Sequence, residues 1–230
     1  MGRLWADRRH NMFTYVQDKE LKKIMISEGS DIMNRLKMRI NNDEYLEVDF
    51  ELVGSGAKNL ITQNGKEPPD VDFNLIILDM NGNYKESDIK DYIKGQLDNV
   101  LREKGHKRGC SDSTSVLTIK SVPANKNVVF SIDVAIIKIE YNNHWYRLIH
   151  EKHGSHAEDR WYWNEGIDYS LIIEKAEAIK QANGWEEFRD RYLERKKRYL
   201  TSNDYNHPSY VVYIEIVNEV YKMFCDRGWI

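Results

Sequence analysis

The chain has 230 residues, which suits a single domain or two small lobes with enough buried core to fold unaided. Its charge is nearly balanced, because 34 basic and 37 acidic residues give a formal net charge of −3. That balance excludes the overall positive field of a nucleic-acid coat protein or of a protein held on a membrane surface.

The beginning of the chain, MGRLWADRRHNMF, contains charges but lacks the apolar run of a secretory signal. No segment reaches the roughly 18 to 20 apolar residues that a transmembrane helix requires. Two cysteines, Cys110 and Cys225, are too few for a disulfide framework. We therefore expect a cytoplasmic protein that does not enter a membrane.

Helical spacing of apolar residues predicts a helix over residues 12–28 and a further helical segment over residues 32–42. Residues 29–31 (Gly-Ser-Asp) interrupt the pattern between them. The interruption is compatible with a kink in one helix or with a true boundary between two helices.

A strand is expected over residues 47–53, followed by a glycine turn at residues 54–56 (Gly-Ser-Gly). Residues 62–69 are polar and carry turn and breaker signals, which predicts a loop. The apolar run at residues 71–78 then predicts a second strand.

Ser87 is a suitable N-cap for a helix whose apolar residues fall on one face and which should end before Gly105. Further strands are expected over residues 115–120 and 127–139, and the second of these alternates apolar and polar residues. Residues 146–150 are able to pair back on that strand through the intervening turn.

From Asp168 onward the pattern becomes helical. It predicts helices over residues 169–182 and 185–200, the first ending at an Asn-Gly signal. Pro208 stands at the favoured first position of a last helix.

Three aspartates lie on strands whose other residues are apolar. Successive side chains of a strand point to opposite faces, so Asp70 and Asp72 share one face while Val71 and Phe73 point to the core. Two carboxylates only about 7 Å apart repel each other, and a divalent cation such as Mg²⁺ explains their placement. Asp133 also leaves the apolar face of its strand, so all three carboxylates can converge on two metal ions if the strands are neighbours.

The glycine turn has the composition of a phosphate-binding loop. Gly54 and its neighbours allow backbone N–H groups to approach a phosphate closely, and Ser55 adds a hydroxyl donor. A short helix beginning there would direct its N-terminus at the anion.

This order of strand, Gly-Ser turn, loop, Asp-x-Asp and a third Asp on a later strand resembles the DNA polymerase β-type nucleotidyltransferase superfamily. The segments VGSGAKN, DVDFNLII and FSIDVAII are most similar to the branch that contains cyclic GMP–AMP synthase, oligoadenylate synthase and the bacterial cyclic-oligonucleotide synthases. The motifs cover roughly residues 45–140, and the remainder is similar only in architecture. Fourteen residues separate Ser55 from Asp70, at the long end of the family pattern.

The resemblance implies an α/β (α+β) fold, with a mixed nucleotidyltransferase sheet flanked by helices, an N-terminal helix and a C-terminal helical lobe. Residues 1–150 would form the N-terminal helix and the catalytic core, and residues 151–230 the helical lobe. The implied activity is metal-dependent transfer from a nucleoside triphosphate with release of pyrophosphate. The implied product is a cyclic or linear oligonucleotide signal of the kind used in antiviral defence.

Site residues carry over from the resemblance by position. Gly54 and Ser55 would bind the triphosphate, Asp70 and Asp72 would hold two Mg²⁺ (or Mn²⁺) ions, and Asp133 would complete the metal site and help to activate the attacking hydroxyl.

The basic stretch at residues 189–198 allows three interpretations. Lys196 or a neighbour would reach the triphosphate from the helical lobe, as a lysine does in the related enzymes. A solvated helix face is the second interpretation, and a nucleic-acid-binding patch with steep salt dependence is the third.

The expected partners are nucleoside triphosphates, and a nucleic-acid or small-molecule acceptor stays open. One alternative function is transfer of a nucleotide to a small molecule such as an antibiotic, or to RNA or protein as in toxin-type enzymes. The other is a nucleotide-binding module without turnover.

Two further clusters also have more than one interpretation. His144 precedes His150, His153 and His156, and the last three would ligate zinc if they lay on a helix. No cysteine accompanies them, whereas a structural zinc site normally has four protein ligands in a closed geometry. A polar loop is therefore the alternative. The aromatic residues 161–163 form either a core between the lobes or a platform on which a base stacks.

Overall fold

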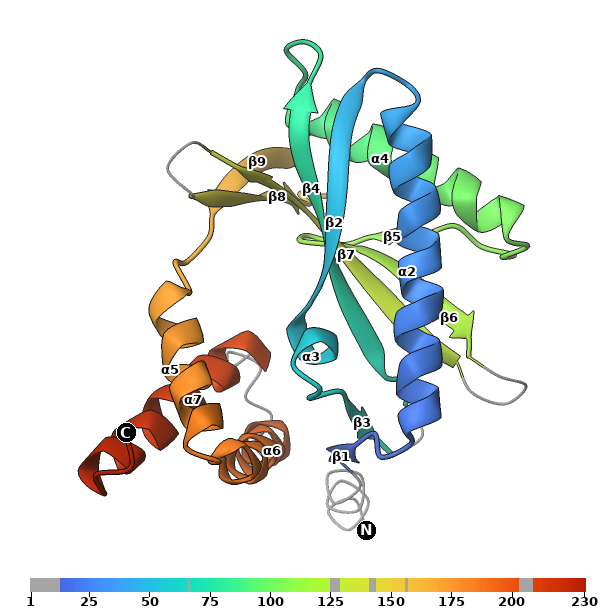
Figure 1. Cartoon of the computed structure of the whole chain (residues 1–230). Coiled ribbons are helices and arrows are strands. Elements are labelled where there is room, and N and C mark those ends of the chain that lie inside the picture. Colours follow the sequence, from blue (N-terminus) through green and yellow to red (C-terminus); the bar gives the residue numbers. More distant parts are fainter. Residues whose placement is uncertain (1–12, 66, 125–128, 141–143, 156, 203–208) are drawn as a thin grey trace. The chain divides into compact units, whose positions relative to one another are not determined.

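The structure, a computed structural model, describes residues 13–65, 67–124, 129–140, 144–155, 157–202 and 209–230 (Figure 1). The chain forms two compact units. The helical unit comprises Met1–Tyr15, Thr62–Glu67 and Asp168–Ile230, and the sheet unit comprises Val16–Ile61 and Pro68–Ile167. The boundary expected at residue 150 lies inside a strand of the sheet unit.

The sheet unit is built on a mixed sheet, as predicted. Its strand order is β2 (Leu46–Val53), β4 (Asp70–Met80), β7 (Val129–Ile139), β6 (Leu117–Pro123) and β5 (Ser111–Asp112). The end of β7 also pairs with β8 (Trp145–Glu151), which pairs with β9 (Arg160–Glu165). Among the described strands of this sheet, β4 and β7 run parallel to each other, and every other pair is antiparallel.

Two helices, α2 (Lys19–Asn41) and α4 (Glu86–Glu103), pack on one face of this sheet (Figure 1). Alternate strand residues such as Val71, Phe73, Ile132 and Val134 are at most 1% exposed and form the core beneath them. The polar residues that alternate with these apolar ones therefore lie on the opposite face of β4 and β7. This arrangement confirms that Asp70, Asp72 and Asp133 leave the core face.

The interruption at Gly29 is not a boundary between two helices, because α2 continues through it. A Cβ atom at this buried position would lie 2.7 Å from Cε2 of Phe73, so glycine allows the helix to approach the sheet closely. The expected start of the helix at residue 12 is wrong. The helix begins after Asp18, whose side chain accepts a hydrogen bond from the N–H group of Leu21 (3.0 Å) and so caps the first turn.

Helix α4 begins slightly before the expected position, with Lys85 rather than Ser87 at its N-cap. Its end is as predicted. Gly105 has φ of +80°, and the N–H groups of Gly105 and His106 donate to the carbonyls of Arg102 and Leu101. These two bonds form a Schellman motif, for which glycine is the preferred residue.

Four of the described strands were missed from the sequence, and one of them is the two-residue β5. Strand β9 contains the aromatic residues 161–163, and two three-residue strands, β1 (Phe13–Tyr15) and β3 (Thr62–Asn64), pair with each other in the helical unit. A three-residue strand offers too few positions for an alternating pattern. The pairing of β8 with the end of β7 confirms the expected hairpin, whose turn lies outside the described residues.

The helical unit contains α5 (Ser170–Gln181), α6 (Trp185–Thr201) and α7 (Ser209–Asp226), close to the predicted bounds. Its core includes Phe188, Tyr192, Ile216 and Phe224. Asn183 takes the left-handed conformation after α5, with φ of 58°. Pro208 lies outside the described residues, and none of the described helices is long and apolar enough to cross a membrane.

Replacing Gly29 by Ala should lower the free energy of unfolding by about 1–3 kcal/mol, because the added methyl group overpacks against Phe73. Gly95 provides the matched control. It lies within α4 with no atom within 4 Å of an added Cβ, so Gly95→Ala should stabilise by roughly 0.5–1 kcal/mol. Urea unfolding of both variants measures the difference, and equal effects would contradict the close approach.

Candidate active site

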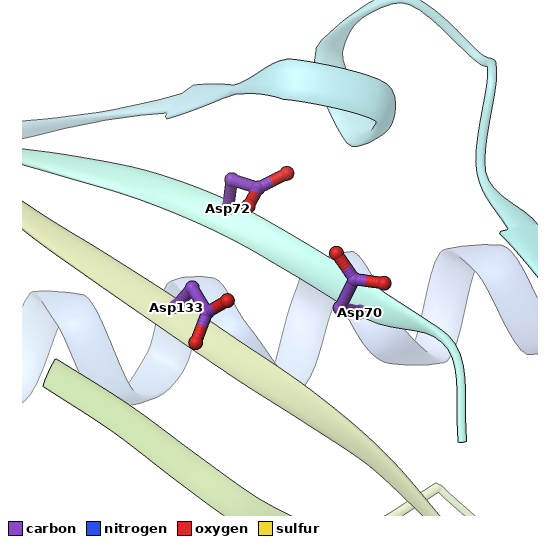
Figure 2. Close-up of side chains that lie close together, drawn as sticks. All are labelled: Asp70, Asp72 and Asp133. Atoms are coloured by element: carbon purple, nitrogen blue, oxygen red, sulfur yellow. The ribbon is translucent and has the colours of Figure 1, made fainter. Parts of the chain in front are cut away.

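The register of two parallel strands brings the three predicted aspartates together. Asp70 and Asp72 are the first and third residues of β4, and Asp72 lies directly beside Asp133 of β7. Figure 2 shows the three carboxylates on the same side of these strands, and one oxygen from each lies within 4.8 Å of the others. Asp70 is exposed, whereas Asp72 and Asp133 are half-buried.

Thr118 fixes the orientation of Asp133. It lies on β6 directly opposite Asp133, and its Oγ1 donates a hydrogen bond of 2.6 Å to Oδ1 of the carboxylate. This residue was not singled out from the sequence. Its contact with Asp133 follows from the pairing of β6 with β7, and no local sequence pattern predicts that pairing.

The environment raises the pKa of Asp133 above its ordinary value of 3.8, chiefly because burial disfavours the charged form. The negative charge of Asp70 acts in the same direction, while the Thr118 hydrogen bond and the charge of Lys120 oppose it. A cation placed among the carboxylates would relieve both unfavourable effects.

The glycine turn predicted to bind phosphate forms α3 (Gly54–Ala57), a single helical turn directly after β2. Gly54 has φ of +61°, and a Cβ at this position would collide with the carboxylate of Asp72. Glycine is therefore required both by the backbone conformation and by the close approach of the turn to the acid cluster. Val53, the residue before the turn, pairs with Asp72 in the sheet.

Ser55 is half-buried in this turn, and its carbonyl accepts a 2.8 Å hydrogen bond from the N–H group of Leu60. Asn59 takes a left-handed conformation with φ of 55° and donates to the carbonyl of Gly56. The turn thus closes on itself, with Gly54 beside Asp72 of the acid cluster.

Lys196 belongs to the helical unit, while the aspartates and the glycine turn belong to the sheet unit. Its Nζ donates to Ser209 Oγ (2.9 Å) and Thr62 Oγ1 (3.3 Å) and lies over the rings of Phe13 and Tyr192. Its contact with a triphosphate stays a prediction.

The donor set fits a divalent cation. Three carboxylates from adjacent strands, one of them open to solvent, offer the hard oxygen ligands that Mg²⁺ and Mn²⁺ prefer and leave room for substrate phosphates and water. The assignment of these three residues as metal ligands stays a prediction, as does the number of ions.

The histidines do not form a zinc site among the described residues. His150 lies at the end of β8 with both ring nitrogens on carboxylates, Nδ1 at 2.6 Å from Asp112 and Nε2 at 2.8 Å from Asp159. Lys90 of α4, 1% exposed, pairs with the other oxygen of Asp112. His150 therefore links β5, β8 and the segment before β9, and His156 lies outside the described residues.

The aromatic residues of β9 pack within the sheet unit. The ring of Trp161 stacks on His150 with centroids 4.3 Å apart, and Trp163 packs against the core beside the ammonium of Lys138. Tyr162, on the opposite face of the strand, is 42% exposed. Two of the three rings are thus used for packing in the sheet unit.

No protein-family profile and no curated protein sequence matches the chain. Among solved structures, Escherichia coli MS115-1 CdnC in complex with HORMA-deltaN matches with a TM-score of 0.60 and 15% identity, covering 98% of this chain and 64% of that one. The same CdnC solved with ATP matches with a TM-score of 0.58 and 13% identity, covering 93% and 64%.

A third match is the Elizabethkingia meningoseptica CdnE cyclic dinucleotide synthase solved with GTP and Apcpp. Its TM-score is 0.52 at 11% identity, covering 95% of this chain and 75% of that one. The chain thus spans 64% of the length of the CdnC chains. These likenesses confirm the predicted fold, which the chain shares with the three structures.

Asp133→Asn should raise the thermal stability of the metal-free protein at pH 7. The folded state holds the pKa of this acid above its unfolded value, so stability is lost as the pH rises through the folded pKa and the carboxyl group ionises. Asparagine removes this loss. The difference in Tm from wild type should shrink as the pH falls below about 3.9, the ordinary pKa of aspartate, because the carboxyl group is then protonated in both the folded and the unfolded chain.

Thermal melts in EDTA across this pH range test the effect. Asp79→Asn is the control, since Asp79 lies exposed on the same strand outside the cluster. A constant difference in Tm at all pH values would contradict the assignment to Asp133.

Thr118→Val should weaken Mn²⁺ binding about tenfold, because loss of a partner that orients a metal ligand typically costs 10–100-fold in affinity. Thr118→Ser keeps the hydroxyl and should bind nearly as wild type does. Calorimetric titration of Mn²⁺ measures both, and equal affinities for the two variants would show that the hydrogen bond has no positioning role.

Proposed function

We propose that the chain is a metal-dependent nucleotidyltransferase that uses nucleoside triphosphates, releases pyrophosphate and builds a cyclic or linear oligonucleotide signal. The observation that carries this proposal is the convergence of Asp70, Asp72 and Asp133 beside the turn that begins at Gly54. The shared fold described above supports it.

Asp70, Asp72 and Asp133 would hold the divalent cations, Mg²⁺ or Mn²⁺. When bound, these cations supply neutralisation of the triphosphate charge and activation of the attacking oxygen. Asp70 is the most exposed of the three and lies at the beginning of β4, where its carboxylate faces solvent and an entering substrate.

Asp133 is suited to take the proton of the attacking hydroxyl. Thr118 occupies its Oδ1, which leaves Oδ2 for the substrate. In the proposed step the hydroxyl oxygen forms a bond to the α-phosphorus and its proton passes to Oδ2. The bond from the α-phosphorus to the bridging oxygen breaks, and pyrophosphate leaves with the electron pair.

Gly54 and Ser55 would hold the β- and γ-phosphates. The close approach of the Gly54 backbone to Asp72, which its positive φ allows, supports this proposal because it puts the turn next to the acid cluster. Lys196 is proposed to reach the same phosphates. Catalysis would then depend mainly on positioning and charge neutralisation.

The choice of product rests on the fold. The E. meningoseptica CdnE that shares it is a cyclic dinucleotide synthase solved with GTP and Apcpp, and the CdnC that shares it was solved with ATP. Purine nucleoside triphosphates are therefore the first substrates to test.

Asp72→Asn should fold normally, but its Mg²⁺-dependent pyrophosphate release should fall by more than about a hundredfold. Mutation of a residue that only orients a metal ligand already lowers metal affinity or activity by about 10–100-fold. Asp79→Asn makes the same chemical change on the same strand outside the cluster and should retain activity. Pyrophosphate release from mixed nucleoside triphosphates, with Mg²⁺ or with EDTA, measures the effect.

Full activity of Asp72→Asn would place the active site elsewhere. Chromatography of the reaction products separates the outcomes further, because an oligonucleotide supports signal synthesis, whereas a nucleotide-modified antibiotic, RNA or protein supports acceptor modification. Nucleotide binding without pyrophosphate release would indicate a binding module.

A further inference from the structure

A small hollow lies where α4 ends, on the side of the sheet that carries the helices. Its volume is about 210 Å³, and its lining consists of Asp98, Arg102, His106, Lys107, Arg108 and Gly109. The three predicted metal ligands lie on the opposite face of the sheet. The hollow is therefore separate from the candidate active site.

The loop that lines the hollow is anchored by hydrogen bonds at both ends. The Schellman motif at Gly105 fixes its beginning. At its other end, Oδ1 of Asp98 accepts a 2.7 Å hydrogen bond from the N–H group of Cys110, and a Cβ at Gly109 would collide with the same carboxylate. Such a loop presents its side chains without a large ordering cost on binding.

The acidic groups near the loop are already paired with other cations. Asp98 accepts a hydrogen bond of 2.8 Å from Lys94, and Lys104 binds both Glu28 and Asp31. Among the residues that the structure describes, neither Lys107 nor Arg108 forms an ion pair. The hollow therefore carries an excess of positive charge.

His106 does not add to this charge at neutral pH, because burial lowers the pKa of its imidazole. The positive charge comes from Arg102, Lys107 and Arg108.

Helix capping explains only part of this arrangement. A cation in the last turn of a helix interacts favourably with the negative end of its dipole, which accounts for Arg102. Lys107 and Arg108 lie beyond the C-cap, Lys104, and the dipole effect falls off within the last turn. Their place beside the hollow has no such structural explanation.

We propose that this hollow binds the phosphate groups of a small ligand, either free pyrophosphate or the phosphate tail of a nucleotide. Pockets for drug-sized molecules measure about 300–1,000 Å³ and are mostly apolar, whereas this one is smaller and lined by charged side chains. Guanidinium groups match phosphate oxygens with two parallel hydrogen bonds, and an ammonium group adds a point charge.

The test uses the whole chain without metal, in EDTA and low salt, so that the aspartate cluster cannot recruit phosphate through a cation. Inorganic pyrophosphate should bind with a Kd of about 1 mM or tighter by calorimetry. Lys107→Ala/Arg108→Ala should weaken binding about tenfold or more, because it removes two charged donors. Lys107→Arg/Arg108→Lys keeps both charges and should retain most of the affinity.

The matched control is Lys19→Ala/Lys23→Ala, which removes the same charge from exposed positions of α2 and should leave the affinity unchanged. A parallel titration with ATP distinguishes the sources. If Lys107→Ala/Arg108→Ala loses affinity for both ligands, the site binds a nucleotide phosphate tail. If it loses affinity for pyrophosphate alone, the site binds the free anion. Three results would overturn the proposal: absence of pyrophosphate binding, an equal loss of affinity in Lys107→Ala/Arg108→Ala and Lys19→Ala/Lys23→Ala, or binding of duplex oligonucleotide alone.

Discussion

The parallel pairing of β4 with β7 is the constraint on which the candidate site depends. It places Asp72 beside Asp133, and the alternation of β4 brings Asp70 to the same face. A shift of the pairing by one residue would turn every side chain of a strand to the other face, so the same register that buries Val71 and Phe73 also exposes the acids. The hydrophobic core thereby specifies the geometry of the polar cluster.

This arrangement has an electrostatic cost. Three carboxylates share a small region, and Asp133 is buried enough for its pKa to be raised. Two features help to hold the group together, namely the Thr118 hydroxyl that donates to Asp133 and the close backbone of Gly54 beside Asp72. A cluster of like charges that is braced in this way fits a site prepared for a cation better than it fits a surface shaped by stability alone.

Much of the fold follows from local patterns, and its departures have identifiable causes. The long strands and the end of α4 at Gly105 were predictable because alternation and capping are local signals. Gly29 was misread as an interruption because its role depends on Phe73, more than forty residues away in the sequence. Strand alternation predicted that the three aspartates leave the core face, and their convergence was expected only if β4 and β7 are neighbours, as the structure shows. Thr118 was not predictable, since its partner is chosen by strand pairing.

The sheet unit also separates two kinds of charged structure. On the helix side, the buried Lys90 pairs with Asp112, which in turn holds His150, and these contacts join α4, β5 and β8 into one framework. Each member of that network has an oppositely charged or hydrogen-bonding partner, as a buried structural network requires. The aspartate cluster differs from this network because its three members are all acids. The same sheet therefore uses paired charges to fix its framework and holds like charges together at the proposed cation site.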